Sequence, residues 1–315
     1  MILSIIIPVY NLEKYITKCL QSVARQAFPV GDLEVIIIND KSTDKTLDKI
    51  KKFQNEFGNF VIINNKKKEG IGHSRNKAIK IATGKYLLFL DGDDELSNDS
   101  LNIMNKFFKK KYDFIGYNFN KLMPNGKTIK LCRKDFRFIK SNKKKRVEFF
   151  LKGEVDGSVI FTVIKKKLIE KNKIFFPKDL HEDIFFIFQT YFYSKKYCLI
   201  NKALYLKRNR KGSVTNIIHK ERICGLLNQF LYIKKFLIKR NFNFNLFSNF
   251  YVIGFMGYTG YLLMENLKIK NITTKINNYK LIHTYLKDIK SYKKRNQTKK
   301  DKIVNLFLKC NKDKV

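Results

Sequence analysis

The sequence contains no tryptophan, only four prolines, and five cysteines among its 315 residues. The cysteines form no CxxC pair and follow no regular spacing, which argues against a disulfide framework and against a zinc site, and is typical of a reducing compartment. The first ten residues are apolar, but they lack a basic start and a small-residue cleavage site. We therefore predict a cytoplasmic protein without a secretory signal peptide.

Acidic residues are also scarce. The chain has 27 Asp and Glu against 65 Lys and Arg, a formal net charge of +38. Such an excess predicts attraction to polyanions, namely nucleic acid, anionic lipid headgroups or phosphorylated substrates. Because Lys, Asn and Ile are all frequent, a coding bias toward these residues is an alternative explanation. Charge alone therefore identifies no partner.

Long unbroken apolar runs are missing as well. The apolar stretch over residues 247–263 is interrupted by Ser, Asn, Gly and Thr. It falls short of the roughly 20 consecutive apolar residues that a membrane-spanning helix needs. A packed core helix is the favoured interpretation, and an interfacial or partner-binding helix is the alternative.

The first hundred residues alternate between apolar, β-branched runs and amphipathic segments. The runs predict strands over residues 3–9, 34–38, 60–63 and 85–90, and the segments predict helices over residues 12–26, 45–57 and 74–82. This alternation is typical of an α/β domain with a mainly parallel sheet. Later in the chain, the pattern predicts strands over 114–120, 158–165 and 203–206, and a helix over 184–193.

Polar clusters stand at the ends of two predicted strands, where open α/β sheets bind their ligands. Asp40 ends the second strand, and a carboxylate there can accept hydrogen bonds from a nucleobase or a ribose. Asp91, Asp93 and Asp94 lie within four residues after the fourth strand. They would repel one another unless a cation compensates, and oxygen ligands suit Mg²⁺ or Mn²⁺ bound to a diphosphate. An acidic helix-capping turn is the alternative.

A glycine-rich turn over residues 70–72 precedes the third predicted helix. Arg75 would lie near the N-terminus of that helix and can hold phosphate through charge-assisted hydrogen bonds. Further along, the basic segment 205–216 carries Arg208 and Arg210, which can stabilise the negative charge of a departing diphosphate. A solvated run of charges is the alternative for that segment.

Three segments in order, SIIIPVYN (4–11), EVIIINDKSTDKT (34–46) and EGIGHSRNKAIKIATGKYLLFLDGDD (69–94), strongly resemble the bacterial glycosyltransferase family 2. Members of that family have the GT-A fold. The resemblance is dense over about residues 2–100 and extends thinly to about residue 216. It implies a Rossmann-like, mainly parallel sheet flanked by helices, with a mostly helical C-terminal extension. The implied domains are a catalytic domain over 1–216, with a nucleotide-binding half (1–100) and an acceptor half (101–216), and a helical basic region over 217–315.

The resemblance also implies where the donor and a metal bind. The implied ligands of the nucleotide-sugar are Pro8, Val9, Tyr10, Asp40, Arg75, Asp91, Asp93, Arg208 and Arg210. Asp91 and Asp93 match the metal-binding DxD motif for Mn²⁺ or Mg²⁺, with Asp93 as the first choice for a direct ligand. Asn39 and Lys41 stand where many members carry Asp and Gly, which leaves the base specificity open.

A reaction that inverts the anomeric centre needs a base on the face opposite the leaving diphosphate. The segment His181-Glu182-Asp183 resembles the Glu-Asp motif that supplies this base in the family. The resemblance implies Asp183 as the base, with Glu182 as the alternative base and orienting partner. An acid pair favoured by the dipole of the following helix is the alternative.

We therefore predict an inverting glycosyltransferase that moves a hexose or N-acetylhexosamine from a UDP-sugar to a hydroxyl of a bacterial surface glycan, such as a capsule or lipooligosaccharide. A metal-dependent nucleotidyltransferase is less favoured, because PVYNLEKY offers no glycine for a phosphate loop. A nucleic-acid-binding protein leaves the acidic cluster unexplained, because acids repel phosphate without a metal. We expect a glycan or lipid-linked glycan acceptor and no nucleic-acid partner.

The basic C-terminal segment predicts a location on the inner face of the cytoplasmic membrane. Residues 268–315 contain 15 Lys or Arg and 3 acids, a formal charge of 15 − 3 = +12. Basic residues near an anionic bilayer contribute about 1 kcal/mol each. A peripheral attachment through this segment is the hypothesis, and a solvated lysine-rich tail is the alternative.

Overall fold

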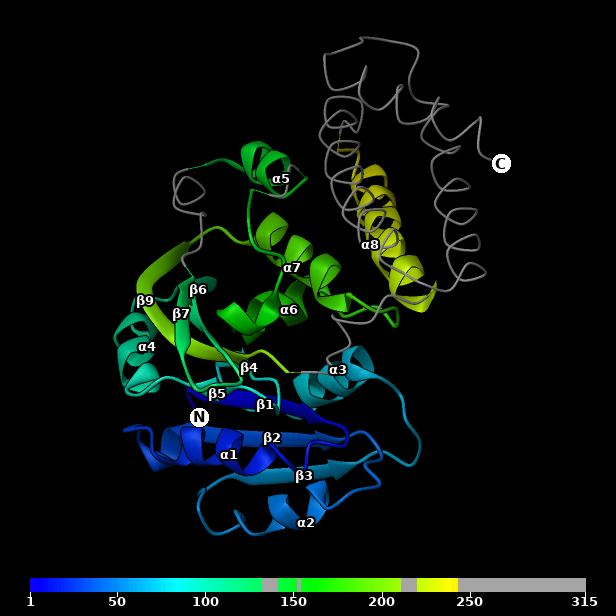
Figure 1. Ribbon diagram of the computed structural model, residues 1–315. Helices are drawn as coiled ribbons and strands as arrows, with labels where there is room; N and C mark the ends of the chain where they lie inside the picture. Colours follow the sequence, from blue (N-terminus) through cyan, green and yellow to red (C-terminus); the bar gives the residue numbers. More distant parts are fainter. Residues whose placement is uncertain (132–140, 152–153, 211–219, 243–315) are drawn as a thin grey trace. The chain divides into compact units, whose positions relative to one another are not determined.

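The computed structural model describes residues 1–131, 141–151, 154–210 and 220–242 (Figure 1). All of them belong to one compact unit, residues 1–255. The predicted domain border at residue 216 lies outside the described residues, and so do the apolar stretch 247–263 and the basic segment 268–315.

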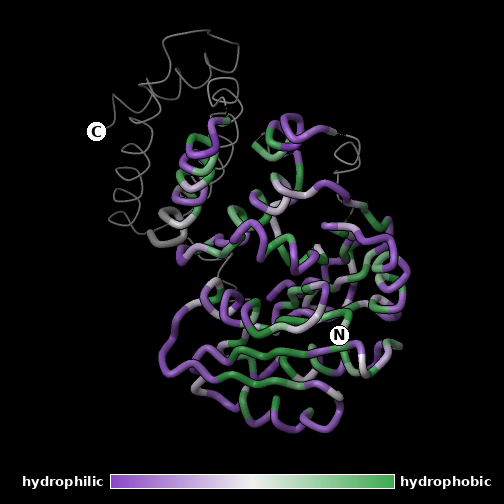
Figure 2. Tube along the Cα trace, turned by 180° about the vertical axis from the view of Figure 1, so that it is seen from behind, coloured by the Kyte–Doolittle hydropathy of each residue, from purple (hydrophilic) through white to green (hydrophobic). Residues whose placement is uncertain are grey.

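The predicted parallel sheet is confirmed for the first four strands. They are β1 (Leu3–Val9), β2 (Leu33–Asn39), β3 (Phe60–Asn64) and β4 (Tyr86–Phe89). They pair in parallel in the order β3-β2-β1-β4. Strands β1 and β4 are fully buried, and Figure 2 shows this part of the sheet as strongly hydrophobic. Burial on both faces explains why the sequence has continuous apolar runs here instead of an alternating pattern.

Three helices connect these strands, with bounds that differ from the predicted ones. They are α1 (Ile16–Ala24), α2 (Thr46–Lys51) and α3 (Ile71–Ile81). α1 begins four residues later than predicted, because the Leu12 backbone N–H donates to the Thr46 hydroxyl at 2.7 Å instead of entering a helix. α3 begins earlier, directly after Gly70, whose φ of 90° ends the preceding loop. α3 packs on β1 and β2.

The remaining strands continue the sheet past β4. They are β8 (Thr162–Lys165), β6 (Phe114–Leu122), β9 (Tyr197–Arg208) and β5 (Glu95–Leu96), in that order from β4, and β7 (Thr128–Leu131) pairs with β6. β6 and β9 are parallel to each other, whereas β8, β7 and β5 are antiparallel to their neighbours. The strand predicted over 158–165 is shorter, because Val159–Phe161 forms a 3₁₀ turn.

The other helices follow β5 in the chain. They are α4 (Ser100–Phe108), α5 (Lys143–Leu151), α6 (Lys166–Asn172), α7 (Glu182–Tyr193) and α8 (Lys220–Lys239). α6 packs on β8, and α7 is almost wholly buried and contacts α5, α6 and α8. Its Phe186 ring stacks on Phe176 with centroids 3.7 Å apart and meets Phe89 of β4 edge-on at 5.7 Å. This aromatic packing fixes the first turn of α7 near the C-terminal end of β4.

Among the described helices, none combines the length and the apolar character that crossing a bilayer requires.

Candidate active site

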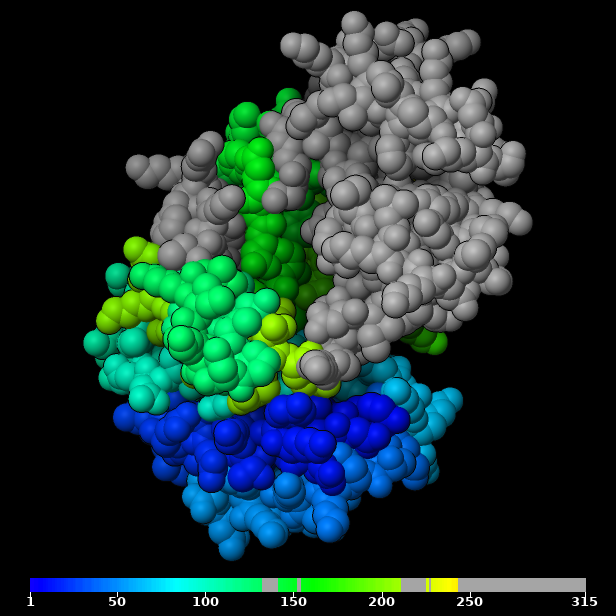
Figure 3. All heavy atoms as spheres, viewed as in Figure 1, coloured from blue at the N-terminus to red at the C-terminus, as the bar shows by residue number. Residues whose placement is uncertain are grey.

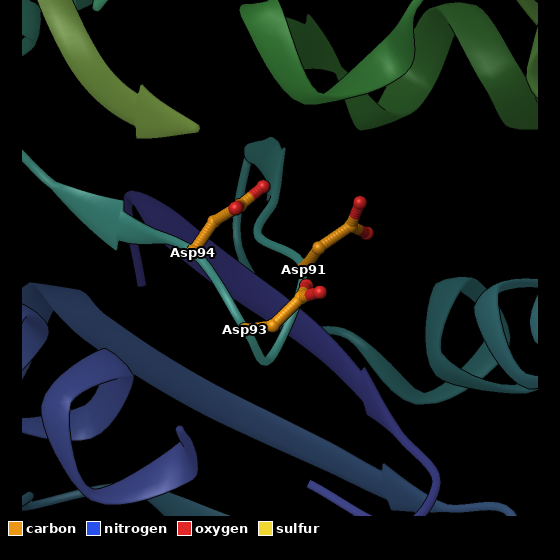
Figure 4. Close-up of side chains that lie close together, drawn as sticks. All are labelled: Asp91, Asp93 and Asp94. Carbon is orange, nitrogen blue, oxygen red and sulfur yellow. The ribbon is translucent and has the colours of Figure 1, made fainter. Parts of the chain in front are cut away.

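The acidic cluster lies in the loop between β4 and β5, as the sequence predicts. Figure 4 shows Asp91, Asp93 and Asp94 leaving this loop, and one carboxylate oxygen from each lies within 4.8 Å of the others. Asp94 is buried and accepts hydrogen bonds from the Tyr205 hydroxyl and the Arg208 backbone N–H, both at 2.7 Å. Burial, together with the charges of Asp93 and Asp91, raises the pKa of Asp94 well above its usual value. Asp94 therefore anchors the loop to β9.

Asp91 and Asp93 are the more open members of the cluster, with side chains 28% and 18% exposed. Gly92 between them explains how the loop fits. A Cβ at this position would meet the Val9 side chain at 2.8 Å and the Leu12 side chain at 2.9 Å. The glycine in the DxD motif therefore allows the loop to lie directly on the segment that follows β1.

Of the three residues predicted to bind the nucleotide at the end of the first strand, Pro8 and Val9 are the last residues of β1 and Tyr10 follows it. Pro8 and Val9 are buried, whereas Tyr10 is 38% exposed. The ammonium of Lys68 lies 3.8 Å from the centroid of the Tyr10 ring. Among these three residues, Tyr10 is the side chain available to a ligand.

Asp40 organises a loop, a role that the sequence analysis missed. Its carboxylate is buried and accepts hydrogen bonds from the Asn65 side-chain amide at 2.7 Å and from the Glu69 and Gly70 backbone N–H groups at 2.8 Å. These bonds hold the loop that leads from β3 into α3. The predicted contact between Asp40 and a nucleobase would have to be made in addition to these three bonds.

Arg75 is buried, and both ends of its guanidinium are engaged by protein. It is 3% exposed and donates to Glu182 at 2.6 Å and to Asp91 at 2.8 Å. Burial works to lower the pKa of Arg75, but the charges of Asp91, Glu182 and Asp183 outweigh it, and the pKa is raised. Arg75 thus joins the acidic cluster to the first turn of α7. The buried Nε of Arg75 has no hydrogen-bond partner among the described residues, and a direct contact with phosphate, as the sequence predicts, would be made in addition to the two ion pairs.

Close packing of α3 on the segment before α7 makes this link possible. A Cβ at Gly72 would meet the Pro177 carbonyl oxygen at 2.6 Å and the Glu182 side chain at 3.0 Å. One turn along, the Asn76 side chain donates to the Phe176 carbonyl at 2.7 Å and accepts from its N–H at 3.0 Å. The GIGHSRN motif is therefore a docking surface for the segment that carries the predicted base.

Glu182 and Asp183 occupy the first turn of α7, but their surroundings differ. Burial raises the pKa of Glu182 to about 7 and that of Asp183 to about 6, although the Arg75 charge acts in the opposite direction on both. Glu182 is held by Arg75, whereas Asp183 has no hydrogen-bond partner within the described part of the chain. A free carboxylate with a pKa near neutrality is suited to accept a proton.

If Asp183 is the base, turnover should fall in mildly acidic solution. The reaction needs the deprotonated carboxylate, and a pKa raised to about 6 means that protonation begins near that pH. We expect kcat at saturating donor to be constant above about pH 7 and to fall about tenfold per pH unit well below pH 6. A pH profile of kcat in non-chelating buffers measures this. A decline that begins only near pH 4, where an ordinary Asp titrates, would contradict it.

Arg208 and Arg210 reach the acidic cluster from the end of β9. The Arg210 guanidinium pairs with the Asp93 carboxylate, and the Arg208 side chain pairs with Glu95 and donates to the Asp93 carbonyl at 3.0 Å. Each guanidinium lies 5.6 Å from the centroid of the Tyr15 ring. The structure thus brings both predicted arginines to the acidic cluster.

Helix α8 supports the segment before the predicted base, which the sequence analysis also missed. A Cβ at Gly225 would lie 2.6 Å from the Leu180 carbonyl oxygen. Asn228 and Tyr232 donate to the Asp179 carboxylate at 2.9 and 2.5 Å. The glycine at position 225 was the available signal, because a glycine inside a helix marks close approach of another backbone.

Comparison with known proteins identifies the family. Residues 4–172, more than half of the 315-residue chain, match the family described as Glycosyl transferase family 2. The chain belongs to this family of glycosyltransferases.

Two curated relatives are similar over about two thirds of this chain. The poly(ribitol-phosphate) beta-glucosyltransferase of Bacillus spizizenii is 35% identical over 203 residues, which is 62% of this chain and 30% of the relative. The poly(ribitol-phosphate) beta-N-acetylglucosaminyltransferase TarS of Staphylococcus aureus is 31% identical over 219 residues, 66% of this chain and 36% of the relative. The match thus spans about a third of the length of these relatives.

Solved structures confirm the predicted GT-A fold. Residues 1–349 of S. aureus TarS, in complex with UDP-GlcNAc, superpose with a TM-score of 0.62 at 21% identity, covering 91% of this chain and 92% of that one. The mannosyltransferase PcManGT of Pyrobaculum calidifontis, in complex with GDP-Man and Mn²⁺, gives a TM-score of 0.56 at 15% identity, covering 92% and 82%.

Proposed function

We propose that this protein transfers a hexose or N-acetylhexosamine from a UDP-sugar to a hydroxyl of a bacterial surface glycan, with inversion at the anomeric carbon. The observation that carries the proposal is the buried Arg75, which joins Asp91 of the DxD motif to Glu182 beside the free carboxylate of Asp183. A donor cluster and an acceptor base are thereby held at a fixed separation. The two curated relatives, named as transferases that act on poly(ribitol-phosphate), support a surface-glycan acceptor. Family membership favours this reading over a nucleotidyltransferase.

The acidic cluster has the donor set for a hard divalent cation. Asp93 and Asp91 would hold Mn²⁺ or Mg²⁺ through carboxylate oxygens, while Asp94 is retained by Tyr205. When bound, the metal supplies positive charge that stabilises the diphosphate as it leaves. The Mn²⁺ in the complex of PcManGT supports this assignment.

The residues of the chain do the remaining chemistry. Asp183 takes the proton of the acceptor hydroxyl, whose oxygen forms the new bond to the anomeric carbon. The bond from that carbon to the diphosphate oxygen breaks, and UDP leaves with the electron pair. Arg208 and Arg210 provide positive charge on the side of the leaving group, where it stabilises developing negative charge. Arg75 does not contact the substrate in this scheme. It keeps the first turn of α7 in place.

Removal of the metal tests the donor site. We expect EDTA to abolish transfer and to remove the stabilisation that UDP with Mn²⁺ gives the protein, measured as a shift in Tm. Asp93→Ala should have the same effect, because it removes the expected direct ligand. Asp48→Ala, at an exposed position on α2, is the matched control and should behave as wild type. Full activity in EDTA would remove the metal from the mechanism.

We also propose that the protein acts at the cytoplasmic face of the membrane, held there by the basic segment 268–315. The full chain should float with anionic vesicles, dissociate at high salt because exposed charges are screened, and lose binding when truncated after Asn266. Neutral vesicles provide the control. Equal recovery of full-length and truncated protein with anionic vesicles would argue against the attachment.

A further inference from the structure

A polar pocket of about 370 Å³ lies beside the acidic cluster, and of its lining residues only Arg208 has a role in the transfer proposed above. One wall is formed by Lys18, Gln21 and Arg25 of α1 and its C-terminal end. The second is formed by Glu95 and Arg208, and the third by the turn between β6 and β7. In Figure 3 the β6–β7 hairpin lies directly above the N-terminal residues on the face shown. The pocket is large enough for a phosphate with an attached polyol or sugar unit, since ligand sites begin at about 300 Å³.

The charges around this pocket favour an anion. Three cationic side chains, Lys18, Arg25 and Arg208, stand against the one carboxylate of Glu95, so the lining carries a formal charge of 3 − 1 = +2. Glu95 is already shared, because Arg208 pairs with it and the Arg25 guanidinium lies 3.6 Å from its second oxygen. The Lys18 ammonium has no ionic partner among the described residues. Its charge and one side of Arg25 are therefore available to a ligand.

The residues that line the pocket differ from the predicted metal ligands. Asp93, the expected metal ligand, and Glu95 are two residues apart in the same loop. Arg208 lies between them, because its side chain pairs with Glu95 and donates to the Asp93 carbonyl. The lining of the pocket includes Glu95 and Arg208, but neither Asp91 nor Asp93. A second phosphate, distinct from the donor diphosphate, therefore fits the pocket.

We propose that this pocket binds a phosphate group of the acceptor, so that the enzyme selects a phosphate-containing glycan; this inference rests on the proposed function. Lys18 and Arg25 contact the phosphate, and Arg208 links its position to the acidic cluster. The strong positive net charge of the chain would then attract an anionic polymer, since attraction between opposite charges raises association rates. Selection of the acceptor would come from Lys18 and Arg25 of this pocket, which take no part in the transfer itself.

Binding of fluorescently labelled poly(ribitol phosphate) chains, used here as the phosphate-containing probe, tests the pocket. Loss of a hydrogen bond to a charged group weakens binding by about tenfold or more. We expect that weakening for Lys18→Glu and for Arg25→Gln. Lys106→Glu makes the same charge change on an exposed position of α4 outside the pocket and should alter binding less than about twofold, the usual scale for a remote surface charge. The shift in Tm caused by UDP and Mn²⁺ should be the same in all variants, which shows that they are folded.

Unchanged binding of poly(ribitol phosphate) by Lys18→Glu and Arg25→Gln would overturn the pocket assignment. The assignment would also be overturned if Lys18→Glu weakened the binding of inorganic phosphate but not the binding of poly(ribitol phosphate). The pocket would then take free phosphate. Lys18→Ala, which removes the charge without reversing it, should lie between wild type and Lys18→Glu. The proposed function is tested separately. A wild-type protein that fails to bind UDP contradicts the donor site, whether or not it binds poly(ribitol phosphate).

Discussion

Asp183→Asn is expected to lower turnover by roughly 10²–10⁴, the usual scale for removing a general base, while UDP affinity stays nearly unchanged. The substitution keeps the size of the side chain, but an amide cannot accept a proton at neutral pH. The position has no hydrogen-bond partner within the described residues, so little structure should depend on the carboxylate. Single-turnover rates at saturating donor, together with UDP binding, measure the two effects independently.

Glu182→Gln is the matched comparison, because it makes the same chemical change one residue away. Glu182 accepts a hydrogen bond from Arg75 at 2.6 Å, and an amide oxygen can still accept that bond, although without the charge. We therefore expect a smaller loss of turnover than for Asp183→Asn. If Glu182→Gln is the severe variant and Asp183→Asn is mild, the roles of the two acids are reversed.

The sequence was sufficient to predict the half of the fold that is built from local, repetitive patterns. β1 has the predicted bounds, and β2, β3 and β4 differ from them by one residue at most at each end. These strands are continuous apolar runs bounded by polar residues, a signal that requires no knowledge of the partner strand. β5 was not predicted, since it has two residues and exists only because it pairs with β9.

The site was predicted as a set of residues and not as a set of contacts. The motif that begins at Gly70 and runs into α3 indicated that Arg75 was functional, but the simplest partner for an arginine near a helix start is a phosphate. Its actual partner, Glu182, lies 107 residues later in the chain. No local pattern encodes such a pairing. It depends on Gly72 and Asn76, which bring α3 against the segment before α7.

The same limit applies to Asp94 and Asp40. Each was assigned to the acidic cluster or to the nucleotide from its place at a strand end. In the structure, Asp94 is tied to Tyr205 and to the Arg208 backbone, and Asp40 holds the loop that precedes α3. A carboxylate at a strand end can serve a ligand or the protein, and only its surroundings distinguish the two.

Arg75→Met should destabilise the protein by about 3–5 kcal/mol, the usual cost of removing one partner from a buried ion pair. The change would leave Glu182 without its cation in a buried position and would free Asp91 from its partner. Arg25→Met is the matched control. The Arg25 side chain is 51% exposed and its guanidinium lies 3.6 Å from Glu95, so its loss should cost less than about 1 kcal/mol. Urea unfolding of both variants measures the difference.

A double substitution, Arg75→Met with Glu182→Gln, then shows whether Arg75 acts through its buried ion pair with Glu182 or binds phosphate directly. If Arg75 acts through Glu182, neutralising that acid removes the unpaired buried charge, and the double variant should be more stable than Arg75→Met alone. A direct phosphate ligand behaves differently: Arg75→Met would weaken UDP binding, leave stability nearly unchanged, and show no coupling to Glu182. The second result would support the role predicted from the sequence, in which Arg75 binds phosphate. The first would establish that the acidic cluster and the base are joined by one buried guanidinium.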